Sequence, residues 1–227
     1  MNTLSWLGHI SLNIAFILYL IVYIPQIIHN QKVTNIAQLS LGLHFLLFSS
    51  YFFDLFYGFS SHLPWQDKTV SIVGLLLVTV QHLQLIKFFI CKRLVLFAKV
   101  SCALLLLSIV GTYYFFIMKD DMLDENTTLI MGTFARICGL IYCIPQIVKN
   151  KQSKSSDAIN IQFIYLNLVL ALLDTTSSWC LNWGWPNKLA APMNVTMMLM
   201  LLLQFKWYED KAQTSEKPQR LALRSRV

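Results

Sequence analysis

The sequence predicts an all-α membrane protein with seven transmembrane helices, built as two parallel three-helix bundles joined by an inverting fourth helix (3+1+3). Apolar residues make up 56% of the 227 residues and charged residues only 13%, which is far from the composition of a soluble globular domain. Seven apolar stretches approach the roughly 20 residues that a helix needs to cross the hydrocarbon. A proline-containing turn and its surroundings also occur twice.

The predicted spans follow one another with short polar connections. They cover approximately residues 4–28, 38–60, 69–90, 94–117, 127–148, 158–181 and 188–207. The chain therefore divides into a first bundle (1–93), a linker helix with an acidic outer loop (94–126), a second bundle (127–208) and a basic tail (209–227).

The duplication relates the first three spans to the last three. Tyr23-Ile24-Pro25-Gln26-Ile27 returns as Cys143-Ile144-Pro145-Gln146-Ile147, at an offset of 120 residues, as from Pro25 to Pro145. Three spans are an odd number, so a second copy following directly would enter the membrane upside down, and the unmatched fourth span restores its orientation. Parallel repeats of this kind usually enclose a solute site near the midplane, which favours a small transporter. Further pairs at the same offset are Asn30 and Asn150, Asp54 and Asp174, Trp65 and Trp185, Lys68 and Lys188, and Gln84 and Gln204.

Basic residues are distributed unevenly over the two faces of the predicted bundle. The loops after spans 1, 3 and 5 and the C-terminal tail hold fourteen Lys and Arg, whereas the opposite loops hold three. The positive-inside rule places the N-terminus outside or in a lumen and the C-terminus in the cytosol. We interpret the basic tail as an orientation determinant, with membrane lipid as a lesser alternative partner and no nucleic acid partner. The fourteen are Lys32, Lys87, Lys92, Arg93, Lys99, Lys149, Lys151, Lys154, Lys206, Lys211, Lys217, Arg220, Arg224 and Arg226.

The repeated proline stands where a transmembrane helix has to bend or end. Proline has no amide hydrogen and its ring crowds the carbonyl four residues earlier, so the carbonyls of Ile21 and Ile141 lose their helical partners. In lipid these groups need partners within the protein, and the neighbouring glutamine amides are expected to supply them. The alternative is that the turns only end the helices at the interface. The candidate gating hinges are Pro25, Gln26, Pro145 and Gln146.

Asp54 and Asp174 each lie about two-thirds of the way along an apolar span. A carboxylate at such depth costs roughly 2.5–3.5 kcal/mol and tends to face a cavity or to be protonated. Either outcome suits proton coupling, because a proton taken up on an acidic side can be released on a neutral side. Ser50 near Asp54, and Asn167 and Ser178 near Asp174, are expected to share their helix faces, and we favour Asp174 as proton carrier or substrate ligand. The alternative is that each acid reaches water at the outer interface.

Arg136 is the one arginine within a predicted apolar span. It must be paired or hydrated. The expected partner is Asp174 on the adjacent helix or Asp54 across the cavity. Alternatively, Arg136 binds a substrate carboxylate in bidentate fashion or snorkels toward the lumenal face.

Amide side chains complete the predicted solute site. Asn194 follows Pro192 in the last span, so the first turn of that helix is expected to be irregular and the amide to reach the cavity. For Gln84 and Gln204 the repetition favours a shared packing or gating role, with solute binding as the alternative. The predicted substrate-binding residues are Asn194, Arg136, Asn167, Gln204, Gln84 and Ser178.

The remaining polar residues of the spans indicate no cofactor. Five cysteines are scattered with neither disulfide nor metal-ligand spacing. His44 and His82 recur in neither repeat and are expected to be satisfied interior or interfacial residues. No nucleophile and base, and no paired metal ligands, recur at a workable spacing. The sequence therefore predicts no enzyme, no metal and no cofactor, with protons as the coupling ion.

Together these features resemble the PQ-loop family over nearly the whole chain. Two Pro-Gln turns stand at the ends of spans 1 and 5, and the segment Trp185-Pro186-Asn187-Lys188 is similar to the amino acid exporters of that family. The family includes lysosomal cystine and cationic amino acid exporters and is related to the SWEET sugar transporters, whose cavity asparagine resembles Asn194. The chain departs from a strict duplication because Gly74 is the counterpart of Asn194 and Phe16 that of Arg136.

The resemblance and the buried acids imply a proton-coupled secondary transporter. It would move a small polar solute, above all an amino acid such as cystine, lysine or arginine, toward the cytosol by alternating access, and a monomer would be sufficient for transport. The resemblance implies a lysosome- or vacuole-type membrane or a bacterial inner membrane. Two alternatives remain open, because fold does not fix function. One is a facilitative SWEET-like sugar transporter, and the other is a seven-helix receptor or accessory protein that binds without transporting.

Overall fold

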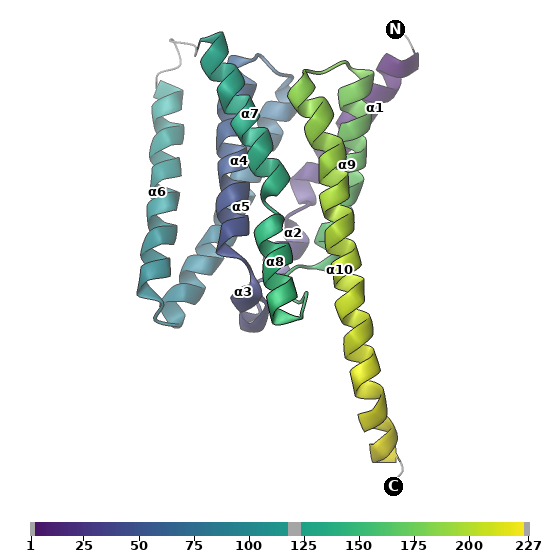
Figure 1. Ribbon diagram of the computed structural model, residues 1–227. Helices are drawn as coiled ribbons and strands as arrows, with labels where there is room; N and C mark the ends of the chain where they lie inside the picture. Colours follow the sequence, from purple (N-terminus) through teal and green to yellow (C-terminus); the bar gives the residue numbers. More distant parts are fainter. Residues whose placement is uncertain (1–2, 118–123, 225–227) are drawn as a thin grey trace.

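The computed structural model describes residues 3–117 and 124–224, and these residues form a bundle of near-parallel helices (Figure 1). Seven long rods lie side by side, two of them broken, and a short helix lies in a connection. This confirms the predicted fold class. In chain order the helices are α1 (Thr3–Ile21), α2 (Ile24–His29), α3 (Val33–Gln38), α4 (Leu41–Ser60), α5 (Trp65–Cys91), α6 (Val95–Ile117), α7 (Glu125–Ile141), α8 (Ile144–Ser153), α9 (Ile161–Cys180) and α10 (Trp185–Arg224).

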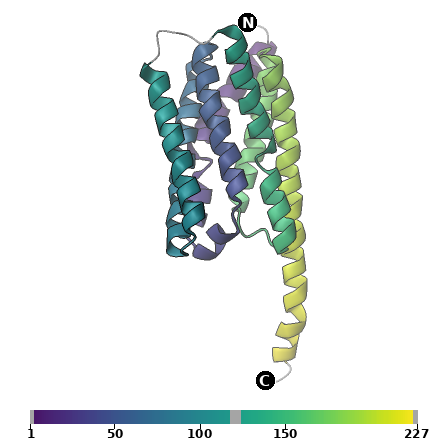
Figure 2. The same cartoon turned by 60° about the vertical axis from the view of Figure 1, so that its left-hand side comes forward.

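The rods have the length and composition of membrane spans. Five segments, 3–29, 65–91, 125–153, 161–180 and 187–209, are long and apolar enough to cross a bilayer. Helices α4 and α6 lie among them in the same bundle and complete the seven (Figure 2). The protein is therefore an integral, multi-pass membrane protein.

Helices of the two halves pack in a matched pattern. Helix α1 packs against α9, and α7, the counterpart of α1, packs against α4, the counterpart of α9. Likewise α5 contacts α1 and α4, just as α10 contacts α7 and α9. The first helix of each half therefore lies against the second helix of the other half. Helix α6 departs from this symmetry, because it packs on α5 and α4 of the first half.

Both broken rods are interrupted where the sequence places the proline. Helix α1 ends at Ile21 and α2 begins at Ile24, while α7 ends at Ile141 and α8 begins at Ile144. A proline stands in the first turn of each new helix, where its missing amide hydrogen leaves no helical bond unmade. We call the end of the bundle that holds α2, α3 and α8 the Pro-Gln end.

The turns at the opposite end are duplicated in detail. His62 after α4 and Asn182 after α9 both adopt a left-handed conformation, with φ of 51° and 53°. The next amide then closes the helix end, from Leu63 to the carbonyl of Gly58 and from Trp183 to that of Ser178, as in a Schellman motif. The following helices α5 and α10 consequently start in the same direction.

The connection into the second half begins with a capped helix. Asp124 precedes α7, and its side chain accepts a hydrogen bond from the Thr127 amide at 3.1 Å. Hydrogen bonds from Thr127, first from its side chain and then from its backbone, hold the pKa of the exposed Asp124 carboxyl below its usual value. The Asp124 side chain at the N-cap is therefore negatively charged, and this charge interacts favourably with the positive end of the α7 helix dipole.

Helix α10 is longer than the sequence predicted. The last span was expected to end near residue 207 and to be followed by a solvated tail, but α10 continues to Arg224 and projects beyond the bundle at the Pro-Gln end (Figure 1). The segment after Tyr208 is rich in Glu, Lys, Gln, Ala and Arg, which are strong helix formers. A polar segment of strong helix formers therefore extends the transmembrane helix, and Pro218 within it does not end α10.

Helices α7 and α4 approach closely at Gly132, and this contact can be tested. A Cβ at this position would lie 2.5 Å from the Tyr57 ring, so Gly132→Ala has to push the helices apart. We expect a loss of about 1–3 kcal/mol of stability. Thermal unfolding in detergent should show a midpoint lower by roughly 2–10 °C.

Gly58→Ala is the matched control. It adds the same methyl group to a helix where the nearest atom would be 3.8 Å away, and it should leave the midpoint unchanged or raise it, because alanine favours helix. Equal midpoints for the two variants would show that the close approach at Gly132 is wrong.

Candidate functional site

A cavity of about 950 Å³, its open mouth included, lies between the two halves. It is lined by α1, α4 and α5 of the first half and by α7, α9 and α10 of the second. The structure brings six of the residues predicted for proton coupling or substrate binding into its wall. These are Asp54, Arg136, Asn167, Asp174, Ser178 and Asn194.

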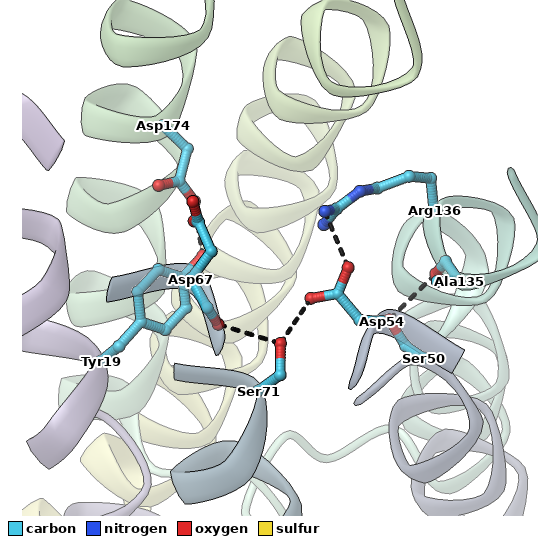
Figure 3. Close-up of polar contacts among 8 residues, drawn as sticks. All are labelled: Tyr19, Ser50, Asp54, Asp67, Ser71, Ala135, Arg136 and Asp174. Carbon is cyan, nitrogen blue, oxygen red and sulfur yellow. Dashed lines mark hydrogen bonds and ion pairs between the residues drawn. The ribbon is translucent and has the colours of Figure 1, made fainter. Parts of the chain in front are cut away.

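Asp54 and Arg136 form an ion pair across the halves. The guanidinium Nη2 lies 2.8 Å from Asp54 Oδ1, and the two side chains are 17% and 31% exposed for Asp54 and Arg136. Ser71 on α5 donates a hydrogen bond to the other carboxylate oxygen at 2.9 Å (Figure 3). Of the two predicted partners of Arg136, the structure therefore selects Asp54, and the arginine faces the cavity rather than snorkelling outward.

Asp174 has a different partner. The Tyr19 hydroxyl on α1 donates to its carboxylate at 2.5 Å (Figure 3). No ion pair to Asp174 is found among the described residues. The cavity therefore holds one carboxylate bound to a cation and another bound to a neutral hydroxyl.

The polar side chains expected to share the helix faces of the two acids line the cavity with them, but they do not hydrogen-bond the carboxylates. Ser50 donates to the carbonyl of Ala135 on α7 at 2.9 Å and not to Asp54. Ser178 and Asn167 donate to carbonyls within their own helix α9. In a water-poor setting, short polar side chains on a helix readily bond a carbonyl one turn back. Asn167 and Ser178 nevertheless line the cavity.

The two carboxylates have different partners because the repeat is not exact at two positions. The counterpart of Arg136 is Phe16, and the counterpart of Tyr19 is Gly139. Gly139 has no room for a side chain, because a Cβ there would lie 2.8 Å from Ser50 Oγ. The first helix of each half therefore presents one polar side chain to the acid of the other half. The two polar side chains do not stand at equivalent repeat positions, because they are one helical turn apart.

Asn194 is the amide of the cavity wall with a buried oxygen that has no described hydrogen-bond partner. Its counterpart Gly74 is closely packed instead, because a Cβ there would lie 2.3 Å from the Tyr51 ring. The wall of the cavity therefore has the Asn194 amide in the second half, whereas at the equivalent position of the first half the Tyr51 ring packs against Gly74.

Sequence reasoning missed three residues of the site, of which Tyr19 and Asp67 line the cavity and Ser71 donates a hydrogen bond to Asp54. Tyr19 and Ser71 belong to apolar stretches in which a single hydroxyl is unremarkable by sequence, and their importance follows only from the carboxylates that they face. Asp67 lines the cavity from the first turn of α5. It lies just before the predicted span 69–90 and was not among the acids considered, but it is the counterpart of Asn187, which also lines the cavity.

Gln26 connects the first Pro-Gln turn to the other half. Its Nε2 donates to the carbonyl of Ala158 at 2.9 Å, and its Oε1 accepts from the amide of Asn160 at 2.8 Å. It also donates to Asn30, one turn on, at 2.8 Å. The prediction that the glutamine would bond the carbonyl freed within its own bend is therefore wrong, because it binds the backbone that leads into α9.

Gln146 makes the reciprocal connection. Its Nε2 donates to the carbonyl of Gln38 at 3.2 Å and to Asn150 at 2.7 Å, and its Oε1 accepts from the amide of Ser40 at 2.7 Å. Each of these bonds is the repeat counterpart of one made by Gln26. We call these two sets of bonds the Gln26 clamp and the Gln146 clamp.

Gln84 and Gln204 support the clamps from behind. Gln84 donates to the carbonyl of Ile27, and Gln204 to that of Ile147, both at 2.9 Å. Gln204 also accepts from Asn150 at 3.0 Å. They lie outside the described cavity lining, so their placement supports the packing or gating role and not the substrate-binding role.

The Pro-Gln end of the cavity is closed by packed side chains. Val22 and Cys143 are fully buried, the Tyr23 and Tyr51 hydroxyls are hydrogen-bonded at 2.8 Å, and the Phe163 ring packs on Tyr23. The cavity lining continues toward the opposite end, to Trp183 and Asn187 beside the α9–α10 turn. The structure is therefore closed on the Pro-Gln side.

Within the described residues, no group of three or more His, Cys, Asp and Glu side chains is arranged to hold a metal ion.

Comparison with known proteins identifies both halves. The family model of the PQ loop repeat matches residues 7–67 and 128–187. A solved structure of a eukaryotic SWEET transporter superposes with a TM-score of 0.59 at 13% sequence identity, covering 92% of this chain and 100% of that chain. No curated protein matches the chain significantly.

If the clamps hold the Pro-Gln end closed, they should protect the buried thiol of Cys143 from reagents. Gln26→Leu/Gln146→Leu leaves two backbone amides and two carbonyls unpaired at the Pro-Gln end, at a cost of about 1–3 kcal/mol for each buried group. We expect Cys143 to react with a thiol reagent at least roughly tenfold faster. Peptide-resolved mass spectrometry would follow the labelling.

Gln66→Leu is the control, because Gln66 makes only a 3.5 Å contact to Asn13 at the opposite end. It should leave Cys143 protected. Unchanged protection in the double variant would show that the clamps do not hold this end closed.

Proposed function

Since this chain belongs to the PQ-loop repeat family, we propose that it is a secondary transporter that couples the movement of a small polar solute to protons. The observation that supports this most directly is the cavity between the halves, where two carboxylates have partners of different charge. Its placement at a repeat interface is where transporters of this type bind their solutes. The SWEET-like fold is consistent with such a role.

Asp174 is the proposed proton carrier. Protonating Asp54 would break its 2.8 Å ion pair with Arg136 and leave a cation without its counter-ion in the membrane interior, which is unfavourable. Protonating Asp174 breaks no ion pair, because its described partner is the Tyr19 hydroxyl. Asp54 is therefore the fixed counter-ion, and Asp174 is the group whose charge changes during the cycle.

An amino acid is the proposed solute, with cystine and the cationic amino acids as the leading candidates. Arg136 offers the donors that a carboxylate prefers, and the Asn194 oxygen is free to accept a hydrogen bond. Asp67 and Asp174 line the same cavity and suit an ammonium group. These groups together match a zwitterion, which carries both charges.

Transport would proceed by alternating access. The two clamps and the hydrogen-bonded pair Tyr23 and Tyr51 keep the Pro-Gln end closed in this state. The distribution of basic residues in the sequence favours a cytosolic location for that end. Solute and proton would enter from the opposite, lumenal or external side. Breaking the Gln26 and Gln146 clamps, with bending of the helices at Pro25 and Pro145, would then open the cytosolic path.

A facilitative sugar transporter is the second candidate. It is favoured by the SWEET-like fold and by Asn194, a neutral amide able to bond hydroxyl groups in the cavity. It is disfavoured by the ion pair and the additional carboxylates, for which a neutral sugar has no counterpart.

The proton assignment can be tested in proteoliposomes with an inward-directed proton gradient. Asp174→Asn keeps the shape of the side chain but cannot change its charge, so gradient-driven uptake of labelled amino acids should fall at least roughly tenfold. Exchange of solute without a gradient should persist. Tyr19→Phe removes the hydrogen bond and keeps the carboxyl, so it should shift the pH profile of uptake while gradient-driven transport remains.

Gradient-driven uptake by Asp174→Asn at the level of the unchanged protein would refute the assignment. Proton-independent flux of glucose, with no amino acid flux, would support the sugar transporter instead.

The ion pair predicts a non-additive pattern of stability. Asp54→Asn leaves the Arg136 charge unpaired in a partly exposed site, which should cost about 1–3 kcal/mol. The double variant Asp54→Asn/Arg136→Gln should recover part of this loss, whereas Asp54→Asn combined with Gln66→Leu should not. Thermal unfolding of the unchanged protein, the single variants Asp54→Asn and Arg136→Gln and their double variant measures the coupling, and purely additive effects would contradict the pair.

A further inference from the structure

A second group of buried polar side chains lies outside the cavity, between α4, α5 and α6. His44 and Ser101 are fully buried, and His82 and Gln81 are 1% and 2% exposed. These helices belong to the predicted membrane-spanning bundle, and polar side chains at such sites are expensive unless they have partners. The expectation that the two histidines are satisfied residues is only partly met.

His82 makes one hydrogen bond, and the rest of the cluster is unpaired. Its Nε2 lies 2.8 Å from the backbone oxygen of Ser101 on α6, and since an oxygen only accepts, this nitrogen bears the proton. His82 Nδ1, both ring nitrogens of His44 and Ser101 Oγ have no described hydrogen-bond partner. The two rings are 6.3 Å apart, centroid to centroid, and nearly perpendicular.

The cluster occurs in one half only. The counterparts of His44 and His82 are Ile164 and Leu202, and Ile164 is a buried part of the apolar core. Helix α6 also packs on the first half alone. The first half, against which α6 packs, is therefore also the half that contains the buried imidazoles of His44 and His82.

We propose that His44, His82 and Ser101 form an acid-sensitive docking site, which holds the linker helix α6 against the first half while both imidazoles are neutral and releases it when they are protonated. This site is separate from the transport cavity, and its test does not depend on the proposed function.

Protonation is unfavourable in the docked state because the described residues around the two rings provide no anion for the added charge. The side chains that line the small void beside His82 are apolar and come from α4 and α6, and α5 adds Gln81, which is uncharged. No Asp or Glu occurs between residues 69 and 118. On α4, Asp54 is paired with Arg136 on the cavity side. The void is lined by Phe45, Phe48, His82, Leu104 and Leu105.

The expected response to acid follows from these contacts. Each imidazole that must be neutral when docked has to lose its proton on docking, so lowering the pH from 7.5 to 5 should favour the released state. Other contacts of α6 are between apolar groups, such as the Phe97 and Phe89 rings, whose centroids are 5.5 Å apart. Ala98 packs with Leu85 and Phe89, and Gly111 lies against the Phe52 ring, while the outer face of α6 is exposed.

The position of α6 can be measured with two spin labels in nanodiscs at pH 7.5 and pH 5. The labels replace Leu107 on α6 and Leu203 on α10, which are 70% and 68% exposed, in a chain whose native cysteines are changed to alanine. The unchanged cluster should give one distance at pH 7.5 and an additional population at pH 5.

His44→Ile/His82→Leu, which installs the residues of the second half, should give the single distance at both pH values. His9→Gln/His62→Gln removes two exposed histidines and should respond like the unchanged cluster. Gly111→Leu, which forces α6 from α4, should give the additional population at both pH values and so identifies the released state.

Two results would overturn the proposal. One is a pH-independent distance with the cluster intact, and the other is a full acid response in His44→Ile/His82→Leu. If the double variant does not fold, the single variants His44→Ile and His82→Leu are each expected to reduce the released fraction at pH 5, and an unreduced fraction in both would be equally decisive.

Discussion

The constraint on which this structure depends is that backbone groups inside a bilayer must find partners within the protein. Proline interrupts the first helix of each half, and the adjacent glutamine does not repair the break locally. It binds the backbone ahead of the second helix of the other half instead. The two halves are therefore joined by amide hydrogen bonds at the Pro-Gln end, and the space between them remains as a cavity with polar walls. A local requirement for hydrogen bonds thus determines the global arrangement.

The same exchange of partners governs the chemistry of the cavity. Helix α1 presents Tyr19 to Asp174, and α7 presents Arg136 to Asp54. Equivalent backbone positions thus hold two different pairs: a carboxylate with a neutral hydroxyl, and a carboxylate with a guanidinium. A duplicated protein needs this difference if one carboxylate is to change its charge while the other keeps a fixed counter-ion.

The sequence predicted the architecture better than the site. Composition, the offset between Pro25 and Pro145 and the odd number of spans per copy were sufficient for the seven-helix fold, because each depends only on local chemistry and chain order. The acids and Arg136 were found because a charge in hydrocarbon is conspicuous. Tyr19 and Ser71 were missed because their importance depends on which helices touch across the halves. The targets of Gln26 and Gln146 were misassigned for the same reason, since a bond to a residue over a hundred positions away has no local signal.

The crossed pairing also limits what either copy could have been before duplication. In its cavity, a symmetric dimer of the first half would bring together two tyrosines and two aspartates without a guanidinium, whereas one of the second half would have two arginines and lack the hydroxyl that faces Asp174. The present site therefore requires two copies that differ at positions 19 and 136. The two faces of the cavity are specialised and are not interchangeable.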